Sequence, residues 1–326
     1  MLNKEKIKKL IDSFKNYNIL VIGDLMIDKY LLGSVHRVSP EAPVPVVNVK
    51  SESFALGGAG NVALNLASLG VRTEIIGVFG DDATGENIEF LLNENKIAFS
   101  KKLIKTGVAT ITKTRVMAQN QQICRIDWEE DVGKYLLTEN ILKYIEQKLS
   151  SFDAVILSDY AKGVVTQSLV NSCRTLARQD KIFIAIDPKP KRVLNIHGFN
   201  LITPNRGEAI EIAEAKNQVN GRYEMDCVCD AIHKKYHPDH LAITLSEDGI
   251  LYSSKDGDRR IYPTITREVA DVSGAGDTVI ATLTTAFTAG ASAEEAVQLA
   301  NLAAGVVVSK VGTATVSDQE LMDRLK

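Results

Sequence analysis

Short apolar segments alternate with longer segments of helical periodicity along most of this chain. Asn18–Gly23 (NILVIG) is the first apolar segment, and 153–158 (DAVILS) and 181–187 (KIFIAID) are similar. Runs of this length suit strands that are buried on both faces, which occur when helices cross over a parallel sheet. The pattern predicts an α/β fold with a mainly parallel central sheet. The clearest helical segments are 59–69, 275–289 and 293–309.

Two segments interrupt this alternation. Residues 30–50 combine alternating β-forming residues with three prolines, and residues 107–126 are also strand-like, with no helical pattern between the strands. We expect antiparallel strands in both segments, forming a small sheet that stands off the main body as a lid. No internal repeat or interdomain linker is visible, so we expect a single domain over residues 1–326.

Composition and charge exclude several classes of protein. Lys and Arg number 38 against 41 Asp and Glu, a formal net charge of −3, so nucleic acid is not an expected partner. We expect no membrane partner, because no run of 18 or more apolar residues occurs and the N-terminus lacks the apolar core of a signal peptide. Four scattered cysteines indicate free thiols and a cytoplasmic location.

The run DVSGAGDT at 271–278 predicts an anion site with a base inside it. Gly274 and Gly276 allow several N–H groups to converge where a helix begins, and the positive end of the helix dipole favours negative charge there. An aspartate would repel a bound phosphate, but Asp277 could take a proton from an alcohol during phosphoryl transfer. The alternative is a helix N-cap with packing glycines.

Two further motifs precede helical segments. In GGAGN, at 57–61, Asn61 could bind hydroxyl groups of a polar ligand, or the motif could be a tight turn and cap. In NRGE, at 205–208, Asn205 and Glu208 could face a hydrated magnesium ion on nucleotide phosphates. The same pair could instead form a reciprocal capping box.

These three motifs, in this order and spacing, resemble the PfkB or ribokinase family of sugar kinases over nearly the whole chain. The resemblance implies a ribokinase-like fold, ATP and Mg²⁺ as cofactors, and a sugar as acceptor. It implies Asp277 as the catalytic base, with the amides of Gly274, Ala275 and Gly276 as the anion hole. The implied cofactor-binding residues are Asn205, Arg206, Gly207, Glu208, Thr244, Ser246, Gly249 and Asn301.

Metal sites also follow from the resemblance. Glu208 and Asn205 would serve Mg²⁺ through phosphates and water, and Asp271 and Ser273 lie where many relatives hold a monovalent cation such as K⁺. Ser246 replaces the glycine that the family usually has on its adenine side.

The runs VIGDLMIDKY, GGAGNVALNLASLG, LSDYAKG and NLAAGVVVSKVGTATV resemble, within this family, kinases of D-glycero-D-manno-heptose 7-phosphate. The implied reaction phosphorylates the anomeric 1-hydroxyl in the supply of ADP-heptose for lipopolysaccharide. In many bacteria such a kinase is half of a bifunctional protein. The H-x-G-H motif of the nucleotidyltransferase half is absent, so we expect either a separate kinase or part of a longer chain.

The sugar pocket and the sugar phosphate need different residue types. Carboxylates and amides suit hydroxyl groups, whereas the substrate's own phosphate needs cations. The substrate-binding candidates are Asp24, Asp28, Gly57, Gly58, Asn61, Arg115, Arg125, Lys162 and Lys189.

The lid strands also suggest a partner. Val44, Val46 and Val49 form an apolar strand that a monomer would leave partly exposed, which predicts a homodimer through the lid. The other expected partners are the sugar phosphate and ATP. Two alternatives are another sugar kinase of the family and a non-catalytic sugar or nucleotide sensor.

Overall fold

The computed structural model describes residues 4–119, 121–192, 194–215, 224–265, 270–310 and 312–324. Its main body is built on an eight-stranded sheet in the order β14-β13-β12-β11-β10-β9-β1-β4. Strands β4, β1, β9, β10, β11 and β12 run parallel, and β13 and β14 are added antiparallel at one edge. The strands are β1 (Asn18–Gly23), β4 (Arg72–Ile76), β9 (Ala154–Ser158), β10 (Phe183–Asp187), β11 (Leu201–Ile202), β12 (His240–Thr244), β13 (Ile250–Ser254) and β14 (Arg259–Tyr262).

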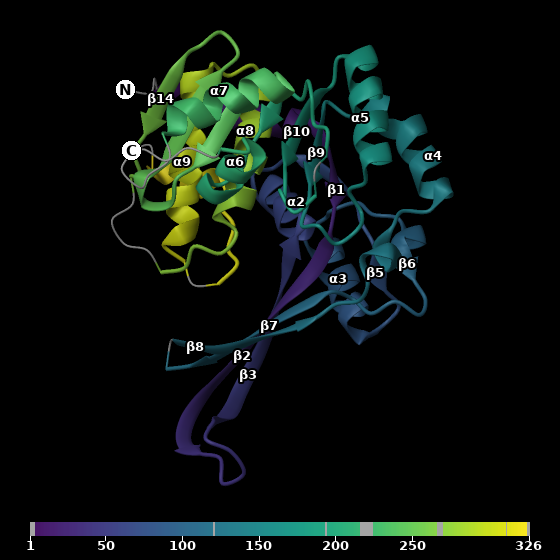
Figure 1. Cartoon of the computed structure of the whole chain (residues 1–326), viewed down its shortest axis with the longest axis vertical. Helices are drawn as coiled ribbons and strands as arrows, with labels where there is room; N and C mark the ends of the chain where they lie inside the picture. The colour runs from purple at the N-terminus through teal and green to yellow at the C-terminus, as the bar shows by residue number, and fades with distance from the viewer. Residues whose placement is uncertain are drawn as a thin grey trace.

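Helices flank this sheet (Figure 1). Helix α2 packs on β1 and β4, α8 on β9 and β10, and α9 on β13 and β14. Helix α5 contacts β10, and α6 contacts β12. The chain moves in one direction across the sheet from β1 to β4 and in the other from β9 towards β12. Because parallel crossovers are right-handed, the connecting helices of these two parts cover opposite faces of the sheet. The helices are α1 (Lys4–Ser13), α2 (Ala59–Ser68), α3 (Ala83–Glu94), α4 (Glu139–Lys148), α5 (Gln167–Asp180), α6 (Arg206–Ile212), α7 (Met225–Tyr236), α8 (Ala275–Thr288), α9 (Ala293–Val308) and α10 (Asp318–Arg324).

The burial of the central strands explains why the apolar segments of the sequence predicted a parallel sheet. Every residue of β9 is buried, and β1 is buried from Ile19 onwards. A strand covered by helices on both faces carries apolar residues continuously rather than alternately. The predicted α/β class with a mainly parallel sheet is confirmed.

A second sheet of four strands extends from the body (Figure 1). Its order is β3-β2-β7-β8, and a short pair, β5 (Phe79–Gly80) with β6 (Ile104–Lys105), lies apart from it. The hairpins β2–β3 and β7–β8 are antiparallel, but β2 and β7 pair in parallel, which corrects the purely antiparallel expectation. The strands are β2 (Leu25–Val38), β3 (Pro45–Gly58), β7 (Thr112–Ala118) and β8 (Gln121–Trp128).

Strand β2 begins five residues earlier than the segment 30–50 suggested. Leu25 and Ile27 are fully buried, so the first part of β2 belongs to the core of the body and only its later part projects. The apolar residues at the start of β2 resemble those of a core strand, which hides this boundary in the sequence.

Among the described residues, no helix combines the length and the apolar character that crossing a membrane requires. Cys124, Cys173, Cys227 and Cys229 are all free thiols.

Gly23 allows β1 and β9 to approach at the end of the sheet that carries the site. A Cβ there would overlap the carbonyl oxygen of Ser158, its partner in β9, and would lie 3.0 Å from the Cβ of Ala59. We expect Gly23→Ala to lower the free energy of unfolding by about 1–3 kcal/mol, because the backbone must shift to accommodate the methyl group. Denaturant unfolding measures the change. Gly133→Ala is the matched control, since its Cβ meets nothing within 4 Å, and equal midpoints for the two variants would contradict the prediction.

Candidate active site

Polar side chains collect at the carboxyl edge of the parallel strands. Asp24 follows β1, Asp159 follows β9, and Asp187 is the last residue of β10. Helices α2 and α8 both begin at this edge and pack against each other. In open α/β sheets this edge is where ligands bind.

Gly274 forms the entry to α8. Its φ is +80°, a conformation that favours glycine, and a Cβ there would lie 2.5 Å from the side-chain nitrogen of Asn61. The helix begins at Ala275, so Asp277 lies in its first turn. The Ala275 N–H donates to the carbonyl of Val272 at 3.3 Å. The turn itself therefore uses one of the three amides, those of Gly274, Ala275 and Gly276, that were predicted to bind an anion.

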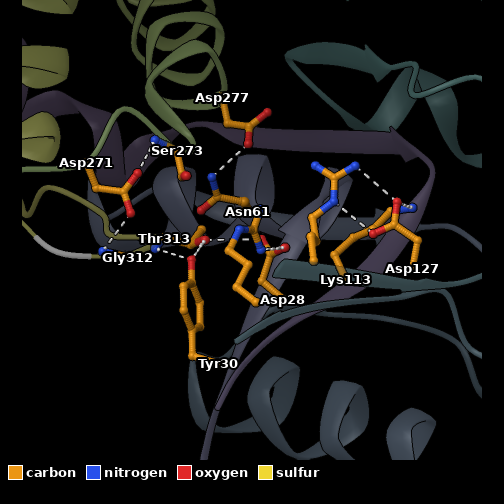
Figure 2. Close-up of polar contacts among 12 residues, drawn as sticks. Asp28, Tyr30, Asn61, Lys113, Asp127, Asp271, Ser273, Asp277, Gly312 and Thr313 are labelled. Atoms are coloured by element: carbon orange, nitrogen blue, oxygen red, sulfur yellow. Dashed lines mark hydrogen bonds and ion pairs between the residues drawn. The ribbon is translucent and has the colours of Figure 1, made fainter. Parts of the chain in front are cut away.

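Asp277 is buried, with only 4% of its surface exposed. One carboxylate oxygen accepts a hydrogen bond from the Asn61 side-chain amide at 2.7 Å, and the other accepts one from the Tyr160 hydroxyl at 2.8 Å (Figure 2 shows the first). Burial raises the pKa of Asp277 to about 6, although these two donors and the charge of Lys189 oppose that rise. A carboxylate with such a pKa can accept a proton near neutral pH.

Asn61 has a different partner from the one expected. Its side chain is fully buried in α2, and its amide donates to the Asp277 carboxylate. Asn65, one turn further along α2, donates to the side-chain oxygen and the carbonyl of Asn61. Asn65 in turn accepts from Thr278 in α8 at 2.8 Å. The glycines that precede Asn61, Gly57 and Gly58, form the end of β3.

Asp24, expected in the sugar pocket, bonds to the loop after β9. Its carboxylate is buried and accepts three backbone hydrogen bonds, from the N–H groups of Tyr160 and Lys162 on one oxygen and of Val164 on the other. Burial raises the pKa of Asp24, and the three N–H groups oppose the rise. The structure therefore uses Asp24 to hold the loop after β9.

The lid presents a charged face above this edge. Arg115 in β7 lies directly opposite Arg125 in β8, and Lys113 lies opposite Asp127, so the four side chains share one face. Lys113 donates to Asp127 at 2.9 Å (Figure 2), and Arg125 donates to the same carboxylate at 2.8 Å. Lys162, from the loop after β9, pairs with Glu129 at 2.7 Å, and Lys113 pairs with the same carboxylate at 2.5 Å.

Asp28 connects this face to the body. It pairs with Arg115, and its second oxygen accepts from the Thr313 hydroxyl at 3.1 Å. The Thr313 N–H donates to the Tyr30 hydroxyl at 3.1 Å (Figure 2). Arg115 also lies 5.4 Å from the centre of the Tyr30 ring. The base of the lid is therefore tied to the segment that follows α9.

Asp271 organises the turn before α8. One oxygen accepts from the Ser273 N–H at 2.9 Å, and the other accepts from the Gly312 N–H at 3.2 Å (Figure 2). Through these two contacts Asp271 joins the turn before α8 to the segment after α9.

Asn205 and Glu208 form the capping box of α6. The Asn205 side chain accepts from the Glu208 N–H at 2.9 Å, and Glu208 accepts from the Asn205 N–H at 2.8 Å. The second oxygen of Glu208 pairs with Lys189. Burial raises the pKa of the neighbouring Asp187 well above its ordinary value, and the charge of Lys189 opposes the rise. Lys189 therefore lies among acids on the α6 side, apart from the lid cations.

The other expected cofactor residues lie near the ends of β11 and β12, except Asn301. Thr244 forms a parallel bridge with Asn205, and Arg206 pairs with Asp248, which lies in the same short turn as Ser246. Asn301, in α9, donates to the carbonyl of Pro263 at 2.7 Å. The remaining members of this group are Gly207, in the first turn of α6, and Gly249, which precedes β13.

A family model described as pfkB family carbohydrate kinase matches residues 16–320. The chain belongs to this family. It is therefore a phosphotransferase that acts on a sugar, and the predicted family is confirmed.

Curated relatives support the family assignment. The chain is 43% identical over 318 residues to the Bifunctional protein HldE of Sulfurimonas denitrificans, covering 96% of this chain. It is 44% identical over 304 residues to the Bifunctional protein HldE of Helicobacter pylori, covering 93% of this chain. In both cases the match covers 65% of the relative's own length, so this pfkB kinase corresponds to only part of those proteins.

Solved structures confirm the ribokinase-like fold. A ribokinase of Arabidopsis thaliana complexed with ribose and ATP matches with a TM-score of 0.71 at 17% identity, covering 95% of this chain and 99% of that chain. Phosphofructokinase-2 of Escherichia coli in complex with potassium matches with a TM-score of 0.72 at 18% identity, covering 95% and 99%.

In the part of the kinase that the structure describes, no group of three or more His, Cys, Asp or Glu side chains is arranged so that it could hold a metal ion. The oxygens of Glu208 are shared between Lys189 and the Asn205 N–H. The donor set of this pfkB kinase therefore fits a magnesium ion that reaches Glu208 through water or through phosphate.

A cavity of about 450 Å³ lies at the opposite edge of the sheet, near the starts of β10 and β11. Arg178 and Lys181 line it at the C-terminal end of α5, where cations offset the helix dipole. This ordinary role explains the charges there, so we do not assign the cavity to the kinase reaction.

Sequence reasoning missed four residues of this kinase site. Lys113 shares the two-residue alternation of Arg115, so strand periodicity could have found it. Asp187 is the last residue of the buried strand β10, and Asp24 directly follows the buried strand β1. This similar position could have identified Asp187 from the sequence. Tyr160 and Thr313 carry no such signal, because their partners lie far away in the sequence.

The raised pKa of Asp277 makes stability depend on pH. Between its ordinary pKa of 3.8 and about 6 the folded kinase binds more protons than the unfolded chain, so stability falls as pH rises through this interval. Asp277→Asn lacks this effect. We expect its free energy of unfolding, relative to the native kinase, to rise by up to about 3 kcal/mol from about pH 4 to about pH 7.

Denaturant unfolding across this pH range measures the difference. Asp256→Asn is the control, because it removes the same charge from an exposed loop. A pH-independent difference for Asp277→Asn would contradict the raised pKa.

Proposed function

We propose that this chain transfers the γ-phosphoryl group of ATP to the anomeric 1-hydroxyl of D-glycero-D-manno-heptose 7-phosphate, in the supply of ADP-heptose. The observation that carries this proposal is the buried Asp277 in the first turn of α8, facing the edge over which the lid holds its cations. Similarity to the HldE proteins supports the heptose as substrate. We place the reaction in the cytoplasm, where ATP is abundant.

In the proposed reaction, Asp277 accepts the proton of the sugar hydroxyl. The hydroxyl oxygen then forms a bond to the γ-phosphorus while the bond to the ADP oxygen breaks, giving the 1,7-bisphosphate and ADP. The structure provides no acceptor among the described residues for the N–H groups of Gly274 and Gly276, so these donors are free to stabilise the phosphoryl group. Positioning and charge stabilisation account for most of the rate in such reactions.

The sugar phosphate would bind at the charged face of the lid. Its phosphate lies at the opposite end of the sugar from the reacting hydroxyl, so its cations must lie away from Asp277. Arg115, Arg125 and Lys162 are the candidates for this role, with Lys113 as a fourth member. Because these cations now pair with Asp28, Asp127 and Glu129, a bound phosphate would compete with carboxylates for them.

The nucleotide would bind on the other side, near the ends of β11 and β12 and the end of α9. Lys189 would serve the ATP phosphates, since it lies beside Glu208 rather than in the lid. A magnesium ion, when bound, would neutralise charge on the transferring phosphates. Asn205 and Glu208 would hold its water shell, and Asp271 with Ser273 would border a monovalent cation site.

Release of ADP across a panel of sugars and sugar phosphates tests this function. We expect D-glycero-D-manno-heptose 7-phosphate to give the highest kcat/KM, and Asp277→Asn to lower its kcat by about 10²- to 10⁴-fold with ATP binding retained. Preference for another sugar would identify another pfkB kinase. Binding of sugar and nucleotide with no turnover on any member of the panel would identify a sensor.

We propose in addition that two copies associate through their lids. Leu32, Val38, Val44 and Val49, in β2, β3 and the turn between them, are all more than two-fifths exposed. An apolar strand of this kind favours pairing with a second copy.

Sedimentation measures this association. We expect twice the chain mass of 35.6 kDa for the native protein and the single mass for the double variant Val44→Asp, Val49→Asp. Phe90→Asp, on the exposed face of α3 outside the lid, should leave the dimer intact. A native mass that stays monomeric at every concentration would overturn the proposal.

A further inference from the structure

Tyr160 contacts Asp277 from the loop after β9, and its hydroxyl has no part in the reaction proposed above. Its hydroxyl lies 2.8 Å from one carboxylate oxygen, and Asn61 donates to the other at 2.7 Å. Burial and the charge of Asp277 raise the pKa of Tyr160 well above its ordinary value. Tyr160 is therefore neutral and acts as the donor in this bond.

The loop that carries Tyr160 is itself held in place. Asp24 accepts backbone hydrogen bonds from Tyr160 at 2.8 Å, Lys162 at 3.0 Å and Val164 at 3.0 Å. The Ala161 N–H donates to Asp159 at 2.8 Å, and Ala161 adopts a φ of +59°. Because the Asp24 carboxylate is buried, the loop cannot exchange these bonds for bonds to water.

Two donors on two oxygens fix the plane of the Asp277 carboxylate. Asn61 alone would leave the carboxylate able to rotate about its last bond, whereas Tyr160 restrains the second oxygen from a separate segment of the chain. The Lys189 ammonium lies 5.2 Å from the centre of the Tyr160 ring and pairs with Glu208. Tyr160 therefore contacts Asp277 through its hydroxyl and Lys189 through its ring.

We propose that Tyr160 is a positioning residue for Asp277, and that Asp24 acts through it by holding the loop after β9. The hydroxyl of Tyr160 aims the Asp277 carboxylate at the acceptor hydroxyl and stabilises its ionised form. Tyr160 keeps its own proton throughout. This inference rests on the proposed function of Asp277 as the base.

The test is the pH dependence of kcat for Tyr160→Phe, using ATP and the sugar phosphate with the fastest turnover in the panel. Loss of a hydrogen bond to a charged group shifts a pKa by about one unit or more, so we expect the acid limb of the profile to move up by roughly one unit. We also expect kcat at its plateau to fall by about 10-fold, with KM for ATP changed by less than about 2-fold.

Tyr144→Phe is the matched control. The Tyr144 hydroxyl also donates to a carboxylate, that of Glu74, at 2.7 Å, but this pair joins α4 to β4 and lies outside the site. We expect its pH profile to match that of the native enzyme. A shift of the same size in both variants would show a general effect of losing a tyrosine hydroxyl and would overturn the proposal.

A second substitution covers the case in which Tyr160→Phe fails to fold. Replacing Tyr160 with 3-fluorotyrosine preserves its shape but makes its hydroxyl a stronger donor, so the acid limb should move to lower pH. An unchanged limb would overturn the role of Tyr160 while leaving the proposed function standing. Near-native turnover of Asp277→Asn would instead overturn the proposed function, and the two failures are thereby distinguished.

Discussion

The rest of the site depends on the burial of one carboxylate, that of Asp277. Removing a charge from water is costly unless donors replace the lost solvent. Here the donors come from α2, through Asn61, and from the loop after β9, through Tyr160, while the first turn of α8 provides the positive end of its dipole. Three segments that are distant in the sequence must meet for this carboxylate to be stable as an anion.

The charged groups of the lid also need partners of opposite charge. Its charged face carries the cations Lys113, Arg115 and Arg125, and each of them pairs with a carboxylate of the lid itself. These pairs keep the cations ordered and shield them from one another. The contacts of Asp28 and Tyr30 with Thr313 attach the lid, where it joins the body, to the segment after α9. The charged face of the lid is therefore held in place relative to the body.

Local pattern predicted the elements of the body closely. Strand β1 has the predicted bounds, and α8 and α9 each end one residue before the prediction, because buried strands and amphipathic helices carry their periodicity in neighbouring residues. The start of β2 was harder to predict, since its first residues are as apolar as those of a core strand. The parallel pairing of β2 with β7 has no local signal at all, because it joins segments about eighty residues apart.

By itself, the sequence determined the fold class, the family and the position of Asp277 at the start of a helix. These follow from spacing, from glycines at turns and from the periodicity of apolar residues. Only the tertiary structure decided the partners of the polar groups, pairing Asn61 with Asp277 and Asp24 with the backbone of the loop after β9. The physical reason is that a buried polar side chain is satisfied by whichever donor the fold brings near, and that donor need not be close in the sequence.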